Sequence, residues 1–244
     1  MTSSDLYKPS AYPPSKTALL LLDYQNVLLD MVPGARKKAV ISAAETLLDA
    51  ARDNDVVILH CIVDVHNAQP AATSKASATW ETQYKPAFFA DPHLGAEFAV
   101  LAPPAPTPIL ASTPVVALAP APVMSRRGSR AKTDRETVFR RAPGIRSALE
   151  SGGIVHYLRH EVGVTHLVIG GIATSGAVLG TATHGTDVGF VVTVVADACW
   201  DPDAHVHDCL VNTVFPSLAW VASVGEAVSY MENGSSLGRA DGDH

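Results

Sequence analysis

Cysteine is scarce in this chain, which has only Cys61, Cys199 and Cys209 among its 244 residues. Three cysteines cannot close a disulfide framework of the kind that stabilises small secreted domains. The first sixteen residues, MTSSDLYKPSAYPPSK, lack the apolar segment of a secretory signal. We therefore expect a cytoplasmic protein with reduced thiols.

Long apolar runs and strong net charge are also missing. Gly, Pro or charged residues interrupt every stretch before it reaches the roughly 18 apolar residues of a spanning helix, so we expect no membrane partner. The formal net charge of −6 gives no general attraction for nucleic acid. Nothing resembles a Walker loop, a dinucleotide-binding fingerprint or a zinc finger, and we expect no cofactor.

Apolar residues are plentiful by contrast, at 47% of the chain against 17% charged residues. This composition excludes a disordered chain, and the length fits one large α/β domain. We expect an extension at 1–16, one domain at 17–232 and a flexible tail at 233–244. A proline-rich insertion at about 103–134 interrupts the domain, and its prolines exclude helix and interior strand. We interpret it as a surface loop, with a lid or an oligomer arm as the alternative.

Apolar runs alternate with helical patterns along the domain. The expected strands are 17–23, 56–63, 137–140, 166–169, 190–196 and 219–222. The expected helices are 35–52, 154–160, 175–184, 204–214 and 226–231. This alternation predicts a three-layer α/β/α fold around a central, mainly parallel, roughly six-stranded sheet of the Rossmann-like type.

In such a sheet the ligand site lies beyond the carboxyl ends of the strands. Asp23 directly follows a four-leucine run, where burial disfavours the carboxylate unless a partner compensates, so we interpret it as functional rather than as a cap. Gln25 and Asn26 could orient it. The strand-to-helix turn at 170–177, GGIATSGA, offers backbone N–H groups to an anion, although its small residues also permit close packing.

Three stretches resemble the signatures of the isochorismatase-like cysteine hydrolases. TALLLLDYQN resembles the opening strand, HLVIGGIATSGAVLGTATHGTDVGFVVTVVADAC the segment around the nucleophilic cysteine, and RRAPGIRSAL the segment of the basic catalytic residue. The resemblance covers most of residues 17–231 apart from the insertion. It implies a homo-oligomer, a dimer or tetramer, that hydrolyses an amide-type C–N bond of a small molecule through an Asp/basic residue/Cys triad.

Two triad positions depart from the family pattern. In register, Ala177 occupies the position of the cysteine and has no nucleophilic group. Arg141 is our choice for the basic position, with Arg140 and Lys132 as alternatives; an arginine stays charged and binds carboxylates bidentately. The chain is either an engineered knockout or a natural, non-catalytic binding or scaffold member. The retained acid favours the first interpretation, and a second altered position favours the other.

The mechanism implied by the resemblance assigns further residues. Asp23 would take the thiol proton, and the backbone N–H groups of Ala173 and residue 177 would hold an oxyanion beside a cis Ile172–Ala173 peptide. We expect substrate contacts from a set of polar and aromatic residues: Gln25, Trp80, Tyr84, Arg140 and Thr174. The aromatic residues of the predicted loop, Trp80, Tyr84, Phe88 and Phe89, line a pocket or pack in the core.

A metal-dependent, nicotinamidase-like amidase is the remaining alternative. Asp64 and His66 have the spacing seen in that branch, and His93 is the nearest candidate for a further ligand. We favour an ordinary polar loop and expect no metal. His205 and His207 are expected to face solvent at a helix start.

Overall fold

The centre of the protein is a seven-stranded sheet in which every neighbouring pair of strands is parallel. In this computed structural model the described residues are 6–65, 74–91, 93–104, 109–110 and 135–232. The strand order is β3-β4-β2-β1-β5-β6-β7. The strands are β1 (Thr17–Leu22), β2 (Val57–Val63), β3 (Ile109–Leu110), β4 (Glu136–Arg141), β5 (His166–Ile172), β6 (Val191–Trp200) and β7 (Trp220–Ala222).

Eight α-helices lie in the described part of the chain. They are α1 (Asn26–Leu29), α2 (Gly34–Asp53), α3 (Lys75–Thr79), α4 (Lys85–Ala90), α5 (Ile154–His156), α6 (Leu179–Asp187), α7 (Ala204–Cys209) and α8 (Val224–Glu232). Four helical segments of π type adjoin five of them, at Trp80–Tyr84 (between α3 and α4), Tyr157–Glu161, Thr174–Val178 and Leu210–Val214. No helix within the described ranges is long and apolar enough to cross a bilayer.

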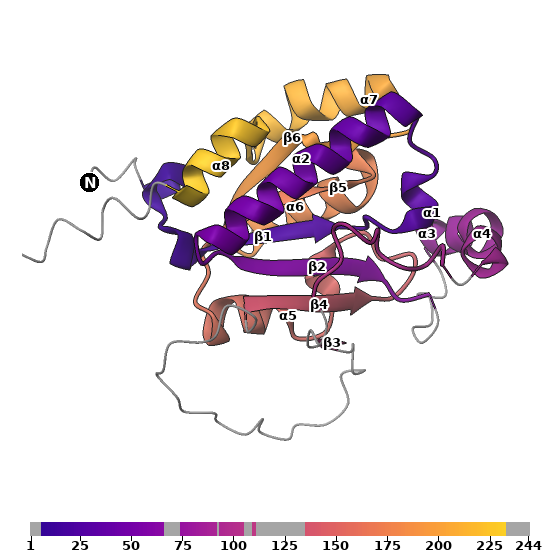
Figure 1. Cartoon of the computed structure of the whole chain (residues 1–244), viewed down its shortest axis with the longest axis horizontal. Coiled ribbons are helices and arrows are strands. Elements are labelled where there is room, and N and C mark those ends of the chain that lie inside the picture. Colours follow the sequence, from indigo (N-terminus) through magenta and orange to yellow (C-terminus); the bar gives the residue numbers. More distant parts are fainter. Residues whose placement is uncertain (1–5, 66–73, 92, 105–108, 111–134, 233–244) are drawn as a thin grey trace, which may run out of the picture.

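Two apolar cores lie on opposite faces of the sheet because successive side chains of a strand alternate between faces. Leu20 and Leu22 of β1 pack in the core beneath α5 and α6, whereas Leu19 and Leu21 pack in the core beneath α2 and α8. Figure 1 shows α2 and α8 lying over one face of the sheet. All six residues of β1 are buried, as in a strand covered on both faces. The predicted three-layer architecture is therefore confirmed.

Two strands run further than their sequence patterns predicted. β5 continues through Gly170 and Gly171, which we had expected to close it, because it lies tight against β1 there. A Cβ at Gly171 would come 2.6 Å from the backbone oxygen of Leu22. β6 continues to Trp200 past an irregularity in its pairing with β5, so Cys199 lies within the strand rather than after it.

Short elements were missed by the sequence patterns. Residues 109 and 110 of the proline-rich segment form β3, the edge strand next to β4, while residues 105–108 and 111–134 of that segment and the tail at 233–244 lie outside the described residues. The helices α1, α3 and α4 lie beyond the arrowheads of β1 and β2 (Figure 1). They therefore flank the edge of the sheet where parallel α/β folds place their ligands.

One buried histidine makes the stability of this fold dependent on pH. The ring nitrogens of His166 lie 3.2 Å from Thr17 Oγ1 and 2.9 Å from Thr193 Oγ1. The side chain is fully buried, and this burial lowers the pKa of His166 to about 3. The unfolded chain binds a proton there at an ordinary pKa of about 6.5, so this stability is lost as pH falls from about 6.5 to about 3.

We predict that His166→Gln removes this part of the acid sensitivity. The stability advantage of the wild type over the variant should shrink by about 2–3 kcal/mol between pH 7 and pH 4.5. Urea unfolding of both proteins at the two pH values measures it. A stability difference that stays constant between the two pH values would contradict the assignment.

Candidate active site

A buried ion pair joins the carboxyl ends of β1 and β4. Arg141 Nη1 donates to Asp23 Oδ1 at 2.7 Å, and Arg141 Nη2 donates to Asp23 Oδ2. The Arg141 Nε donates to the backbone oxygen of Ile145 at 2.8 Å. Both side chains are about 95% buried. Each carboxylate oxygen of Asp23 therefore accepts a hydrogen bond from the same guanidinium group.

The strand order explains why these two side chains meet. β2 lies between β4 and β1, and its backbone fixes the residues at both strand ends. The Asp23 amide donates to the Cys61 oxygen at 2.9 Å, and the Asp64 amide donates to the Arg141 oxygen at 2.8 Å. Asp23 has a φ of 58°, in the left-handed region that Asp tolerates better than most residues.

The charge of Asp23 controls the ionisation of its partner. Burial alone would lower the pKa of the Arg141 guanidinium, but the negative charge of Asp23 and its hydrogen bonds raise that pKa above the ordinary value. Arg141 therefore remains a cation and cannot exchange protons with a ligand near neutral pH.

The turn after β5 lies at the same edge of the sheet as Asp23, because β5 runs parallel to β1 and pairs Gly171 with Leu22. The Ile172–Ala173 peptide is cis, and the π-helical segment Thr174–Val178 follows it directly. Ala177 is 4% exposed and belongs to the same apolar cluster as Leu22 and Cys61. The turn therefore lies near the carboxyl ends of β1 and β2.

Two residues that the sequence patterns did not single out for this role hold the turn in place. The buried Asp201 accepts a hydrogen bond from the Ser175 amide at 2.7 Å through Oδ2. The Thr174 hydroxyl lies 2.8 Å from His207 Nδ1. His207 is thus half-buried against the turn instead of facing solvent as expected, and burial lowers its pKa. An acid directly after an extended strand was the signal that could have identified Asp201.

The other residues expected to contact substrate lie in different surroundings. Gln25 is fully buried, and its Nε2 donates to the Gly95 oxygen at 2.7 Å while its Oε1 accepts from the Val63 amide at 3.1 Å. Its side-chain amide therefore connects the end of β2 to the loop at Gly95 instead of orienting Asp23. Arg140 is half-buried, one residue before Arg141 on β4, and Lys132 lies outside the described residues.

The aromatic residues of the predicted loop lie instead on the π-helical segment Trp80–Tyr84 and on α4. Trp80 and Phe88 are buried with their ring centroids 5.1 Å apart, which is core packing. Tyr84 and Phe89 are 36% and 55% exposed. Of these four residues, only Tyr84 and Phe89 present aromatic surface to solvent.

The three thiols of the chain do not replace a nucleophile at position 177. Cys61 and Cys199 are fully buried, and burial raises the pKa of Cys61 well above its ordinary value and that of Cys199 to about 12. Cys209 is exposed at the end of α7. Buried thiols with raised pKa values are poor nucleophiles because the thiolate is the reactive form.

The residues considered for a metal do not form a group in the described part of the chain. Asp64 is buried, His93 is exposed and His66 lies outside the described residues. Among the residues that the structure describes, no set of three or more His, Cys, Asp and Glu side chains is placed to hold an ion.

Part of the chain matches a known protein domain. Residues 132–226 match the isochorismatase domain. Over 67 residues the chain is 33% identical to the uncharacterized isochorismatase family protein YecD of Escherichia coli O157:H7, an alignment that spans 28% of this chain and 36% of that protein. The chain thus matches only about a third of the length of this relative.

Solved structures resemble nearly the whole chain. A cysteine hydrolase from Pseudomonas syringae pv. phaseolicola 1448A superposes with a TM-score of 0.64 at 16% identity, covering 91% of this chain and 94% of that one. An isochorismatase family protein from Burkholderia thailandensis gives a TM-score of 0.58 at 19% identity, covering 89% and 96%. The fold is that of the isochorismatase-like hydrolases. The sequence match to the isochorismatase domain itself is confined to residues 132–226.

We predict that breaking the Asp23–Arg141 pair costs far more stability than changing the neighbouring arginine. Arg141→Ala should lower the free energy of unfolding by about 3–5 kcal/mol, because it leaves a buried carboxylate without its counterion. The matched control, Arg140→Ala, should cost less than about 1 kcal/mol. Urea unfolding at pH 7 measures both changes.

The double variant Asp23→Asn/Arg141→Met separates the pair from the packing around it. It should lose less stability than Arg141→Ala, because no unpaired charge remains buried. Equal losses in the Arg141→Ala and Arg140→Ala proteins would show that the pair does not hold the strand ends together.

Proposed function

We propose that this chain binds small carbonyl compounds of the amide type at a site formed by Asp23, Arg141 and the turn at Ala173 to Ala177, without hydrolysing them through a thiol. The fold is that of the isochorismatase-family hydrolases. The observation that carries the proposal is the bidentate Asp23–Arg141 pair together with a methyl side chain at position 177.

Thiol-dependent hydrolysis requires a nucleophile and a base that can take its proton. Ala177 supplies no nucleophile. Both oxygens of Asp23 already accept hydrogen bonds from a guanidinium group that stays charged, so neither oxygen is oriented toward a thiol. A lysine at this position would act as a single point charge and would leave the carboxylate less fully engaged. Departures at two positions, 141 and 177, favour a natural binding protein over a single engineered replacement.

The parts of the site that recognise a carbonyl compound remain. The turn is held by Asp201 and by the Thr174–His207 contact, so its backbone is organised before any ligand arrives. We assign the backbone N–H groups of Ala173 and Ala177 to the carbonyl oxygen of the ligand. Preorganised donors of this kind stabilise negative charge on oxygen without reorganising at the moment of binding.

The competing interpretation, a hydrolase that lacks only its cysteine, makes a different prediction. It expects Ala177→Cys alone to hydrolyse an amide. On our proposal Ala177→Cys stays near background, while Ala177→Cys/Arg141→Lys is faster by about 10²-fold or more, the usual contribution of a positioned base. Release of ammonia from a panel of small amides and ureas measures the rates.

A second experiment measures binding of the same amides and ureas to the unmodified chain. A panel member that the double variant hydrolyses should bind the unmodified chain with a Kd within about threefold of that for Ala177→Cys, because the missing sulfur acts mainly in the transition state. Calorimetry measures both constants. Turnover by Ala177→Cys alone at the rate of the double variant would refute the proposal, as would a hydrolysed compound that the unmodified chain does not bind.

A further inference from the structure

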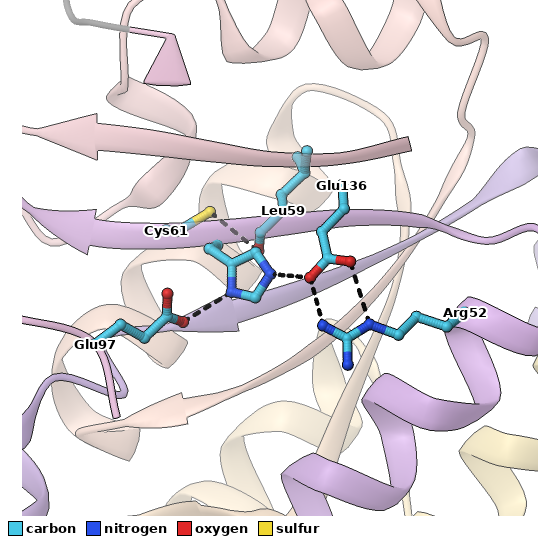
Figure 2. Close-up of polar contacts among 6 residues, drawn as sticks. Arg52, Leu59, Cys61, Glu97 and Glu136 are labelled. Atoms are coloured by element: carbon cyan, nitrogen blue, oxygen red, sulfur yellow. Dashed lines mark hydrogen bonds and ion pairs between the residues drawn. The ribbon is translucent and has the colours of Figure 1, made fainter. Parts of the chain in front are cut away.

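Four ionisable side chains form a connected row on the face of the sheet that α2 covers. Figure 2 shows Glu97, Glu136 and Arg52 in sequence along this row, and the imidazole of His60 lies between the two glutamates. His60 Nδ1 lies 2.8 Å from Glu97 Oε1, and His60 Nε2 lies 2.8 Å from Glu136 Oε1. Arg52 donates to both oxygens of Glu136, at 2.8 and 3.2 Å. His60 is fully buried, and both glutamate side chains are only 7% exposed.

The two hydrogen bonds of His60 need one more proton than a neutral imidazole carries. A neutral imidazole has a single N–H, and an ionised carboxylate can only accept. Both ring nitrogens face a carboxylate oxygen, so either His60 is an imidazolium or Glu97 is protonated. Burial alone would lower the pKa of His60, but the hydrogen bonds and charges of Glu136 and Glu97 raise it to about 9. Burial also raises the pKa of Glu97.

Glu97 connects this row to the turn that carries Asp23. The backbone of Glu97 forms a β-bridge with Gln25. Around the bridge, the Asn26 amide donates to the Ala96 oxygen at 2.9 Å, the Val27 amide to the Leu94 oxygen at 3.0 Å, and the Phe98 amide to the Tyr24 oxygen at 2.8 Å. Residues 93–98 therefore form the wall along the turn at residues 23–27.

We propose that His60 and Glu97 are positioning residues of the candidate site, and that their hydrogen bond holds residues 93–98 against the turn that follows Asp23. The proposal rests on the proposed function only in treating that turn as part of a binding site. A buried row of charges stabilises a fold no better than apolar side chains of similar volume would. Holding a loop in one arrangement is a role that apolar packing cannot perform with the same directionality.

Several elements place charged or titratable groups around His60. Glu97 approaches from the 93–98 segment, Glu136 from β4, and Arg52 from α2 through Glu136. Tyr24 and Asp23, on the turn, interact electrostatically with Glu97. Loss of the shared proton leaves Glu97 facing an uncharged ring beside Glu136 and Asp23. The folded state binds this proton more tightly than the unfolded chain, so the stability that the proton contributes is complete below about pH 6.5 and is lost as pH rises through about 9.

The experiment compares His60→Gln and Glu97→Gln with His166→Gln, a matched control at the other fully buried histidine of the sheet. Hydrogen exchange at pH 7 reads the amides of Asn26, Val27 and Phe98. We expect exchange at these three amides to be at least about tenfold faster in the first two variants, with the β1 ladder unchanged. The control should leave the three amides as in the wild type. Glu97→Gln keeps the side-chain shape and serves if His60→Gln does not fold.

A pH titration provides a readout that a purely structural role would not change. In the wild type, the ring nitrogen resonances of His60 and the amide resonances of Asn26, Val27 and Phe98 should titrate together near pH 9, and the amide titration should vanish in His60→Gln. Faster exchange throughout the sheet, or three amides that do not follow His60, would overturn the proposal. These measurements use no ligand, so their failure is distinguishable from failure of the proposed binding function.

Discussion

The buried contact between Asp23 and Arg141 is the constraint on which the candidate site depends. Removing two charges from water is costly, and the cost is offset only when each charge faces the other in good geometry with its remaining hydrogen-bonding groups satisfied. Both carboxylate oxygens and the Nε of the arginine are satisfied here. The pair therefore fixes the ends of β1 and β4 relative to each other across β2, and the loops that leave those strands start from defined positions.

On the proposed function, the same contact distinguishes this site from that of a thiol hydrolase. A carboxylate that is fully engaged by a permanent cation is a good counterion and a poor base. On the same proposal, the alanine at position 177 leaves no thiol whose proton a base would have to take. The two differences are consistent with each other, because a site without a thiol has no use for a proton acceptor.

A second set of buried charges lies on the other face of β2. His60 and Cys61 are neighbours in the sequence, so their side chains point to opposite faces of the strand. Cys61 packs in the core near Ala177, whereas His60 contacts Glu97 and Glu136. The strand between β1 and β4 thus separates the Asp23–Arg141 pair from the His60 row. Glu97 connects the His60 row to the Asp23–Arg141 pair, because its side chain contacts His60 and its backbone pairs with Gln25 in the turn after Asp23.

Local patterns in the sequence were sufficient to predict the three-layer α/β/α architecture. The four-leucine run before Asp23 predicts a strand buried on both faces, and the spacing of apolar residues in 35–52 predicts the helix observed at Gly34–Asp53. These elements are encoded in residues close together in the chain. The sequence patterns predicted that β5 and β6 end several residues before their observed ends. Glycine and mixed polar residues are typical of strand ends, and they follow the apolar part of each strand. The tight approach of β5 to β1 at Gly171 makes that glycine part of the strand.

The sequence by itself also identified Asp23, the turn at 170–177 and the unusual residue at position 177, because each belongs to a recognisable local motif. It left the choice among Arg140, Arg141 and Lys132 open. Only the tertiary structure brought Arg141 against Asp23, across 118 positions of sequence. The contacts of Asp201 with Ser175 and of His60 with Glu97 were likewise decided by the fold. Such pairs carry no sequence signal, because the distance between two side chains depends on how the strands are ordered in the sheet, and that order is set by the packing of the whole domain.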